Sequence, residues 1–360
     1  MDWPEHGAMP DAFMKKINQP VPENMTDFSV NTNPLGAPAA LLAELPGWAA
    51  DVEHYPDYRY KELIKDLAAW NNVEESCIHP GNGASELIYI TASLFSEKKA
   101  LIIEPAFSEY RKALEAYRCE VQSFLTTEED SWEVDLSAFY QALDEVESVW
   151  ICNPNNPTGT AQSRQTMTAM INACEKRGIY VIIDEAFFDF QADPVTYGTE
   201  AARLNGHVIV IRSLTKMYAI PGIRAGYALA PPSFIEKMQE RTPSWNIGST
   251  AEKAMRFAAS LEPFRQKTAQ FIQTERSRLL PLLKEAGFTV SPSNVNYYLI
   301  RRSDEGPMLP VLKKAAEYGF MLRHTYSFQG LEGNYIRIAV KQKTDNDRLV
   351  HMLREVMPLC

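Results

Sequence analysis

The chain has 360 residues, of which 45% are hydrophobic, and a formal net charge of −10. This length is sufficient for a large core and favours two domains, while the acidic balance without a basic stripe argues against nucleic-acid binding. No run of about 18 apolar residues occurs, and the N-terminus lacks a basic start followed by an apolar segment, so we expect neither a membrane span nor a secretory signal. The expected location is the cytoplasm.

The five cysteines are scattered and never form a Cys-x-x-Cys pair. This pattern is typical of reduced cytosolic thiols rather than of a disulfide framework or a zinc site, and we expect no metal. The cysteines are Cys77, Cys119, Cys152, Cys174 and Cys360.

Residues 1–24 are rich in proline, methionine and polar residues and show no clear period. They indicate an N-terminal arm rather than a core element, and a flexible end is the simpler interpretation of its one suggestive pair, His6-Gly7. Residues 27–36 begin with a short alternation and end in turn residues. Asn31 could orient a polar ligand group there, although asparagine is also an ordinary turn residue.

Two segments that precede helices could bind an anion. Tyr55, in an aromatic turn before the predicted helix 60–70, could offer a phenolic donor or could simply be packed. Gly81 and Gly83 precede the predicted helix 87–95, so backbone N–H groups at the helix start could approach a phosphate. This is not the dinucleotide fingerprint, because Glu86 stands where a third glycine is needed.

Three further segments place chemical groups at strand ends. Phe107 follows the predicted strand 99–105, where an aromatic ring could stack on a planar ligand or belong to the core. Strand 148–152 ends in Asn-Pro-Asn-Asn-Pro, in which two X-Pro bonds make a rigid turn that holds the Asn156 amide in place. Strand 180–183 ends in Asp184, whose carboxylate could pair with a protonated ring nitrogen. Magnesium binding is the alternative, but no P-loop accompanies it.

Lys216 lies just beyond the apolar run 207–212, in a turn rich in hydroxyl groups. A lysine that is partly desolvated and near another cation, here Arg224, has a lowered pKa and becomes a usable amine nucleophile. Ser213, Thr215 and Arg224 could together hold a phosphate. For Lys216 alone, an exposed lysine in an ordinary loop is the alternative.

The alternation of strands and helices from residue 75 to 235 predicts an α/β fold with a mostly parallel sheet and helices on both faces. Functional groups are expected at the carboxyl ends of such strands. After residue 260, a helix over 262–285 and shorter elements predict a smaller α+β domain. We assign residues 45–259 to the large domain, and residues 25–44 with 260–360 to the small one.

Two arginines of the predicted small domain lie in or beside strands. Arg323 is at a strand end and Arg337 is inside an alternating strand. Their guanidinium groups are suited to bidentate recognition of carboxylate or phosphate. A strand face in contact with solvent is the alternative for each.

Three motifs occur together in a familiar order: NPNNPTG at 153–159, DEAF at 184–187, and SLTK at 213–216 followed by Arg224. With these motifs, essentially the whole chain resembles the fold type I (class I/II) aminotransferases, which depend on pyridoxal 5′-phosphate (PLP). Within them it is most similar to the threonine-phosphate decarboxylase group of cobalamin synthesis, and next to the histidinol-phosphate aminotransferases. The finer resemblance rests on His6-Gly7 and on residues 27–36, 218–222, 243–245, 323–324 and 328–331.

The resemblance implies a role for each motif residue. Lys216 is expected to attach the cofactor and move protons at the substrate, and Asp184 to keep the pyridine nitrogen protonated. Asn156 is expected to bond the 3′ oxygen, and Phe107 to stack on the ring. Tyr55 is expected to reach the cofactor phosphate from the neighbouring subunit of a homodimer with shared sites. The phosphate contacts expected within one chain are Gly83, Ala84, Ser85, Ser213 and Arg224.

The resemblance also implies a small substrate that carries carboxylate and phosphate groups. Its expected contacts are His6, Gly7, Asn31, Asn156, Arg323 and Arg337. One departure concerns Phe187, beside the ring, where many aminotransferases have a tyrosine that bonds the 3′ oxygen. Phenylalanine is ordinary in the decarboxylase group, so it favours decarboxylation. A second departure is Ala8, which stands where the decarboxylases have a second glycine and so weakens the expected contact between arm and phosphate.

The predicted activity is decarboxylation of L-threonine O-3-phosphate to (R)-1-aminopropan-2-yl phosphate. The alternative is an aminotransferase that acts on histidinol phosphate or another amino acid. A catalytically silent PLP-fold binding module is a third possibility, and the complete set of Lys216, Asp184 and Asn156 argues against it.

Overall fold

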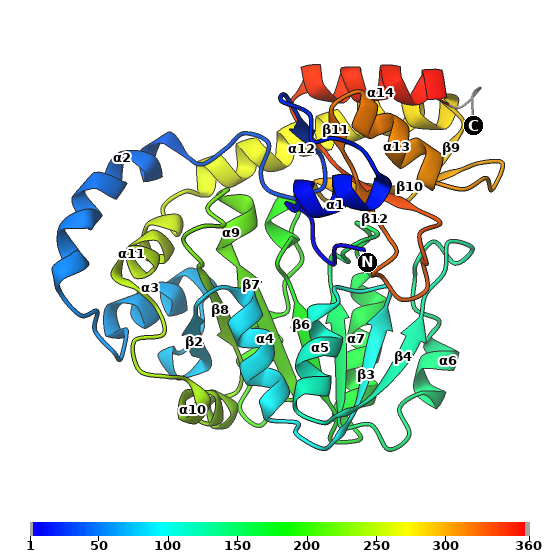
Figure 1. Cartoon of the computed structure of the whole chain (residues 1–360). Helices are drawn as coiled ribbons and strands as arrows, with labels where there is room; N and C mark the ends of the chain where they lie inside the picture. The colour runs from blue at the N-terminus through cyan, green and yellow to red at the C-terminus, as the bar shows by residue number, and fades with distance from the viewer. Residues whose placement is uncertain (1–2, 357–360) are drawn as a thin grey trace.

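The computed structural model describes residues 3–356 and contains a central seven-stranded sheet in the order β2-β8-β7-β6-β5-β3-β4 (Figure 1). Strands β3 to β7 pair in parallel, whereas β8 is antiparallel to both of its neighbours, β7 and the edge strand β2. The α/β fold with a mostly parallel sheet is therefore confirmed. The strands are β2 (Ile78–Gly81), β3 (Lys99–Glu104), β4 (Glu120–Leu125), β5 (Ser148–Cys152), β6 (Tyr180–Asp184), β7 (Val208–Ser213) and β8 (Gly226–Leu229).

Apolar side chains on both faces of the central strands bury this sheet between helices. Along β6, Val181 and Ile183 join one core cluster, whereas Ile182 between them joins a second cluster on the other face. Successive strand residues point to opposite faces, so an unbroken apolar run requires a cover on each side. The helices of this part are α3 (Lys61–Asn71), α4 (Ala84–Ser93), α5 (Glu109–Ala116), α6 (Leu136–Gln141), α7 (Arg164–Glu175), α8 (Gly198–Ala201), α9 (Leu214–Met217), α10 (Pro232–Arg241) and α11 (Ser249–Ala258).

The C-terminal part forms a second, four-stranded sheet in the order β12-β13-β10-β9, with α12, α13 and α14 gathered beside it at the top of Figure 1. The predicted segment 321–324 serves two sheets: β11 pairs in parallel with β1, and β12 pairs with β13. The elements are β1 (Thr26–Asp27), α12 (Glu262–Glu285), β9 (Phe288–Val290), β10 (Tyr297–Arg302), α13 (Leu309–Glu317), β11 (Phe320–Met321), β12 (Arg323–His324), β13 (Ile336–Ala339) and α14 (Lys343–Val356).

The N-terminal arm contains a core helix, α1 (Pro10–Ile17), so the prediction that residues 1–24 hold no core element was wrong. Phe13, Met14 and Ile17 are buried in the main hydrophobic cluster. These three side chains form an apolar stripe of only two helical turns, too short to stand out as a period in the sequence. Before the helix, Trp3 stacks on Tyr326 with ring centroids 4.3 Å apart, and this contact holds the start of the arm against the C-terminal part.

The remaining elements connect these parts. Helix α2 (Ala39–Trp48) packs against α11. The domain boundary predicted at residue 44 falls inside this helix. The division into domains stays a prediction. Short 3-10 helices are η1 (Ala49–Glu53), η2 (Glu75–Cys77) and η3 (Phe188–Phe190). Within residues 3–356, no helix is long and apolar enough to cross a membrane. Four cysteines are buried free thiols, and Cys360 lies outside the described residues.

Candidate active site

A cavity of about 460 Å³ lies at the carboxyl ends of the central parallel strands. Cys152, Asp184 and Ser213, the last residues of β5, β6 and β7, line it, and its volume is typical of small-molecule sites. The cavity brings together most of the residues singled out in the sequence. Those that line it are His6, Gly7, Asn31, Ala84, Ser85, Phe107, Asn156, Asp184, Phe187, Ser213, Lys216, Arg224, Arg323 and Arg337.

Two predicted residues do not line this cavity. Gly83 is the N-cap of α4 and directly precedes Ala84 and Ser85, which do line the cavity. Tyr55 is 83% exposed and is in contact with Trp245, with ring centroids 4.9 Å apart, so it does not reach the cavity of its own chain.

Lys216 enters the cavity from the short helix α9, directly after β7. Burial, followed by the positive charges of Arg337 and Arg224, lowers the pKa of its ammonium group to about 8, although the carboxylate of Asp184 opposes this shift. The turn at residues 31–33 fixes this helix, because Asn33 donates from its backbone N–H to the Lys216 carbonyl (3.0 Å) and from its side chain to the Met217 carbonyl (2.7 Å). The cavity therefore holds an amine that deprotonates far more easily than an ordinary lysine.

Asp184 lies at the end of β6, where two donors hold its carboxylate. The Tyr110 hydroxyl donates to Oδ2 at 2.6 Å, and the Ala186 backbone N–H donates to Oδ1 at 2.9 Å. Burial raises the pKa of Asp184, and the hydrogen bond from Tyr110 is the largest effect that opposes this rise. The carboxylate is thus fixed on both oxygens before any ligand enters.

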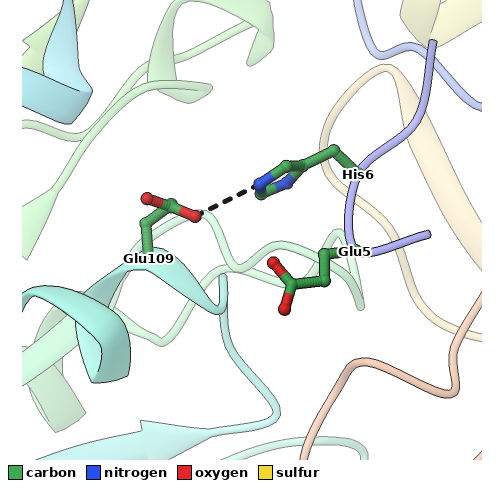
Figure 2. A group of neighbouring side chains, drawn as sticks. All are labelled: Glu5, His6 and Glu109. Atoms are coloured by element: carbon green, nitrogen blue, oxygen red, sulfur yellow. Dashed lines mark ion pairs between the residues drawn. The ribbon is translucent and has the colours of Figure 1, made fainter. Parts of the chain in front are cut away.

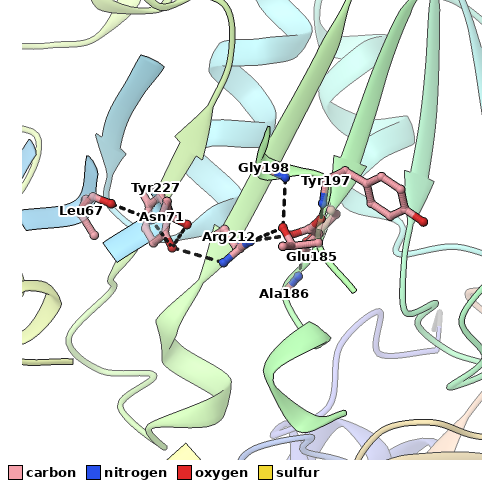
Figure 3. A network of polar contacts seen from close by, with 10 residues as sticks. Leu67, Asn71, Glu185, Ala186, Tyr197, Gly198, Arg212 and Tyr227 are labelled. Atoms are coloured by element: carbon pink, nitrogen blue, oxygen red, sulfur yellow. Dashed lines mark hydrogen bonds and ion pairs between the residues drawn. The ribbon is translucent and has the colours of Figure 1, made fainter. Parts of the chain in front are cut away.

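A buried ion pair between Arg212 of β7 and Glu185, which directly follows β6, is drawn in Figure 3. Arg212 Nε lies 2.7 Å from Glu185 Oε2, and the Tyr197 backbone N–H donates to the other oxygen of Glu185 at 2.7 Å. Side chains alternate along strands, so Asp184 and Ser213 face the cavity while their neighbours Glu185 and Arg212 face away. Removing one partner of such a buried pair costs about 3–5 kcal/mol, so the pair holds the two strand ends in place.

The start of α4 and the loop around Arg224 form a cradle with hydrogen-bond donors. Gly83 has φ +79 and provides no side-chain cap, so the first backbone N–H groups of α4 are left for a ligand. A Cβ added at Gly83 would lie 2.5 Å from Arg224 Nη2, so only glycine lets the guanidinium come this close. Ser213 Oγ and Thr215 Oγ1 are 2.8 Å apart nearby. Helix start, hydroxyl groups and guanidinium together suit a phosphate.

Arg337 is 6% exposed and lies over the cavity from β13. Its Nη1 donates to Asn156 Oδ1 at 2.5 Å and its Nη2 to the Ser29 carbonyl at 2.6 Å, while Nε has no hydrogen-bond partner among the described residues. Burial lowers its pKa to about 10. Asn31, on the same side, has a buried Oδ1 that is also unpaired within residues 3–356. Unsatisfied buried polar groups are costly, so these atoms point to a polar ligand.

Arg323 is 3% exposed, so neither arginine lies on a strand face in contact with solvent. Its guanidinium donates to the Pro4 carbonyl at 3.1 Å, to Ser327 Oγ at 2.6 Å and to the Glu5 carbonyl. Burial lowers its pKa to about 9. The N-terminal arm therefore occupies donors of Arg323 that an anionic ligand would otherwise use.

The arm is also attached to α5 by charged groups, and Figure 2 shows the ion pair of His6 with Glu109, with Glu5 nearby. His6 Nε2 lies 3.2 Å from Glu109 Oε1, and the Lys112 ammonium pairs with both Glu5 and Glu109. The His6 ring is 5.8 Å from that of Phe107. These contacts hold the arm across one side of the cavity mouth.

A family model for class I and II aminotransferases matches residues 23–353, nearly the whole chain. The chain belongs to this family. It is 32% identical to the threonine-phosphate decarboxylase of Salmonella typhimurium over 343 residues, with 93% of this chain and 92% of that protein covered. It is equally 32% identical to histidinol-phosphate aminotransferase 2 of Archaeoglobus fulgidus, with 97% and 96% covered.

Solved structures of other proteins share the fold of this chain. The histidinol-phosphate aminotransferase of Clostridium acetobutylicum superposes with a TM-score of 0.87 at 29% identity, covering 93% of this chain and 100% of that one. The cofactor of the family is PLP. The cavity of this chain fits that group, because it offers an amine at Lys216, a fixed carboxylate at Asp184, and a cradle for the phosphate at Gly83 and Arg224.

Some groups of the site were missed in the sequence. Tyr110 is the most important, since it contacts Asp184; it follows Phe107 by three residues at a helix start, and this spacing was a signal that could have been used. The Ser29 carbonyl, which binds Arg337, carries no sequence signal because every residue has a backbone carbonyl. Glu109 and Ala186 also line the cavity without having been singled out.

Proposed function

We propose that this member of the class I and II aminotransferase family catalyses the PLP-dependent decarboxylation of L-threonine O-3-phosphate. The observation that carries the proposal is that two buried arginines, Arg323 and Arg337, line the cavity that contains Lys216. An amino acid phosphate carries two anions at once, and a buried guanidinium is a suitable partner for each. The similarity to a threonine-phosphate decarboxylase over nearly the whole chain supports this substrate class.

The roles that we propose at the cofactor follow from the cavity. When bound, PLP supplies an electron sink for the bond that breaks at the substrate Cα. The Lys216 amine would hold the cofactor covalently and would then move a proton at the substrate, and the Asp184 carboxylate would hold the proton of the ring nitrogen. The ring of Phe107 would pack against that of the cofactor. The Asn156 side chain accepts from Arg337 through Oδ1, so its amide N–H groups are the donors for the 3′ oxygen.

The phosphate of the cofactor is assigned to the cradle. The backbone N–H groups of Ala84 and Ser85 start α4, where the helix dipole favours an anion. The Arg224 guanidinium adds a positive charge next to them, and Ser213 adds a hydroxyl.

The reaction that follows depends on how the substrate anions are held. Only a bond that is perpendicular to the ring plane overlaps its π system, so decarboxylation requires the carboxylate to be held in that direction. We assign this task to the Nε–H of Arg337, which has no partner among the described residues, and to the side-chain N–H groups of Asn31, because its unpaired Oδ1 is an acceptor and could bond only a donor of the substrate. Arg323, with His6 and Gly7 of the arm, is assigned to the phosphate, which would take the place of the Pro4 and Glu5 carbonyls at its guanidinium.

The alternative activity is transamination of histidinol phosphate or another amino acid. It is supported by the equal identity to a histidinol-phosphate aminotransferase. Phe187 favours decarboxylation, because its ring packs edge-on against Tyr297 with centroids 4.8 Å apart and offers no hydroxyl to the cofactor.

A product assay tests the proposal. The PLP-loaded protein is incubated with L-threonine O-3-phosphate in the absence of any keto acid, and CO2 and the phosphorylated amine are measured. We expect repeated turnover with equal amounts of both products, and none from the Lys216→Ala variant. An absence of CO2, together with single-turnover conversion of PLP to pyridoxamine phosphate by histidinol phosphate, would establish the aminotransferase instead.

We further propose a homodimer in which Tyr55 reaches the cofactor phosphate of the partner subunit. Its support is that Tyr55 is exposed and forms an aromatic patch with Tyr58 and Trp245 outside its own cavity. Sedimentation velocity is expected to show a dimer, and a mixture of Tyr55→Phe and Lys216→Ala subunits is expected to contain hybrid dimers with one fully wild-type site. A monomer with full activity would remove this proposal. The cytoplasmic location stays a prediction.

A further inference from the structure

Tyr110 occupies a position beneath the cavity that the proposed roles do not use. It belongs to the first turn of α5 and is 1% exposed. Its hydroxyl donates to Asp184 Oδ2 at 2.6 Å, and the ring is surrounded by apolar neighbours, including Phe107 and Trp150 with ring centroids 6.0 and 6.1 Å away. The hydroxyl is therefore directed at a single carboxylate in an otherwise apolar pocket.

We propose that Tyr110 is a positioning residue that acts through Asp184. Its hydroxyl keeps the carboxylate ionised and in one orientation, so that Asp184 holds the proton on the ring nitrogen of the cofactor. This inference rests on the PLP-dependent function proposed above.

Two opposing effects determine whether the Asp184 carboxyl group is charged. Burial in apolar surroundings disfavours the charged carboxylate, whereas a hydrogen bond to the charged form favours it. Without the Tyr110 hydroxyl, the only hydrogen-bond donor left to this carboxylate within residues 3–356 is the Ala186 backbone N–H. Asp184 would then become neutral more easily and could rotate, and a neutral or rotated carboxyl group holds a ring proton less well.

Tyr110 itself is suited to donate throughout the working pH range. Burial, followed by the negative charge of Asp184, raises the pKa of its phenol well above the usual value of 10. The nearby Cys152 thiol donates to the Pro154 carbonyl at 3.2 Å, so it does not take the place of the phenol at Asp184.

The test is Tyr110→Phe, which removes one oxygen and leaves the ring that packs against Phe107 and Trp150. Protein reconstituted with PLP labelled with ¹⁵N in the ring is titrated by NMR, and the dissociation constant for PLP is measured separately. We expect the ring nitrogen to lose its proton at least about one pH unit lower than in the wild type, and PLP to bind about tenfold more weakly, as loss of a hydrogen bond to a charged group implies. The matched control is Tyr218→Phe, which removes another buried hydroxyl, one that donates to the Ala258 carbonyl at 3.2 Å outside the cavity lining.

A double-mutant comparison separates a positioning role from a packing role. In the Asp184→Asn background, Tyr110→Phe is expected to cause no further change in the ring-nitrogen titration, because the residue through which it acts is already altered. Additive effects in that background, equal effects from Tyr218→Phe, or an unchanged titration and PLP affinity in Tyr110→Phe would each overturn the inference while leaving the proposed function intact. Failure of the wild-type protein itself to bind PLP would instead overturn the proposed function.

Discussion

Replacing Arg337 with alanine is expected to weaken substrate binding far more than cofactor binding. The side chain is buried, is fixed by Asn156 at 2.5 Å and Ser29 at 2.6 Å, and retains an unpaired Nε. A hydrogen bond to a charged group contributes about 1.5–3 kcal/mol, so the loss of the one bond that Nε can donate to a substrate anion costs about that much. This free energy corresponds to roughly a 10- to 150-fold rise in the substrate Kd.

The assay is a titration of the cofactor absorbance with substrate at saturating PLP, accompanied by a separate PLP titration. PLP affinity is expected to change less than about fivefold, because the only effect on a proposed cofactor contact is that Asn156 Oδ1 loses its hydrogen bond from Arg337. Arg337→Lys is expected to be intermediate, since it keeps the charge but loses the planar fork. Arg276→Ala is the control: Arg276 is half-buried, its pKa is lowered to about 10 by burial, and it donates to the Val295 carbonyl (3.1 Å) away from the cavity lining.

Two results would refute the reasoning. A substrate Kd within threefold of the wild-type value would remove Arg337 from the anion site. Equal losses of substrate and PLP affinity, or an equal loss in Arg276→Ala, would show that the side chain supports the fold rather than the ligand.

The further predictions concern the cofactor end of the site. Lys216→Ala is expected to abolish turnover and also covalent attachment of PLP after borohydride reduction, measured by intact mass; retained turnover would end the assignment. In the cofactor-free protein, the Lys216 pKa of about 8 predicts that the rate of PLP attachment rises through pH 8 as the amine becomes neutral, and a stopped-flow rate that stays constant from pH 7 to 9 would contradict it. Because this pKa is below the ordinary 10.5, the unfolded chain binds more protons between these two values, so Lys216 makes the free energy of unfolding rise with pH over that range. Gly83→Ala is expected to weaken PLP binding about tenfold, because its Cβ would displace Arg224 and because φ +79 with ψ 167 is a conformation that costs about 1–3 kcal/mol for a residue other than glycine. Gly222→Ala, whose Cβ meets nothing within 4 Å, is the control, and equal affinities for PLP would refute the cradle.

The regular α/β part was predictable because its signals are local. The strand that leads to Lys216 contains the unbroken apolar run 208–211, and in the structure all six residues of β7 are buried. Likewise Asp184 follows an apolar run and lies at the end of β6. Parallel strands place their carboxyl ends at one edge, so the shared location of these groups followed from the alternation of strands and helices alone.

The arm was misjudged because its apolar stripe is short. Phe13 and Ile17 are four residues apart in a helix of eight residues, and proline and polar residues surround them. A helix of this length is marginal on its own, so it is the packing against the main core that stabilises it. That packing partner is remote in the sequence.

The sequence by itself determined which functional groups follow which strands, and hence the fold class, the family and the residues that can serve PLP. Only the tertiary structure decided what faces those groups. Arg337 meets Asn156 across 181 residues of chain, and Arg323 meets Pro4 across 319. Strand periodicity tells which residues share a face, but it does not tell whether solvent, a ligand or another segment covers that face. The contacts that orient Asp184, Arg323 and Arg337 therefore depend on the packing of distant segments, which no local pattern records.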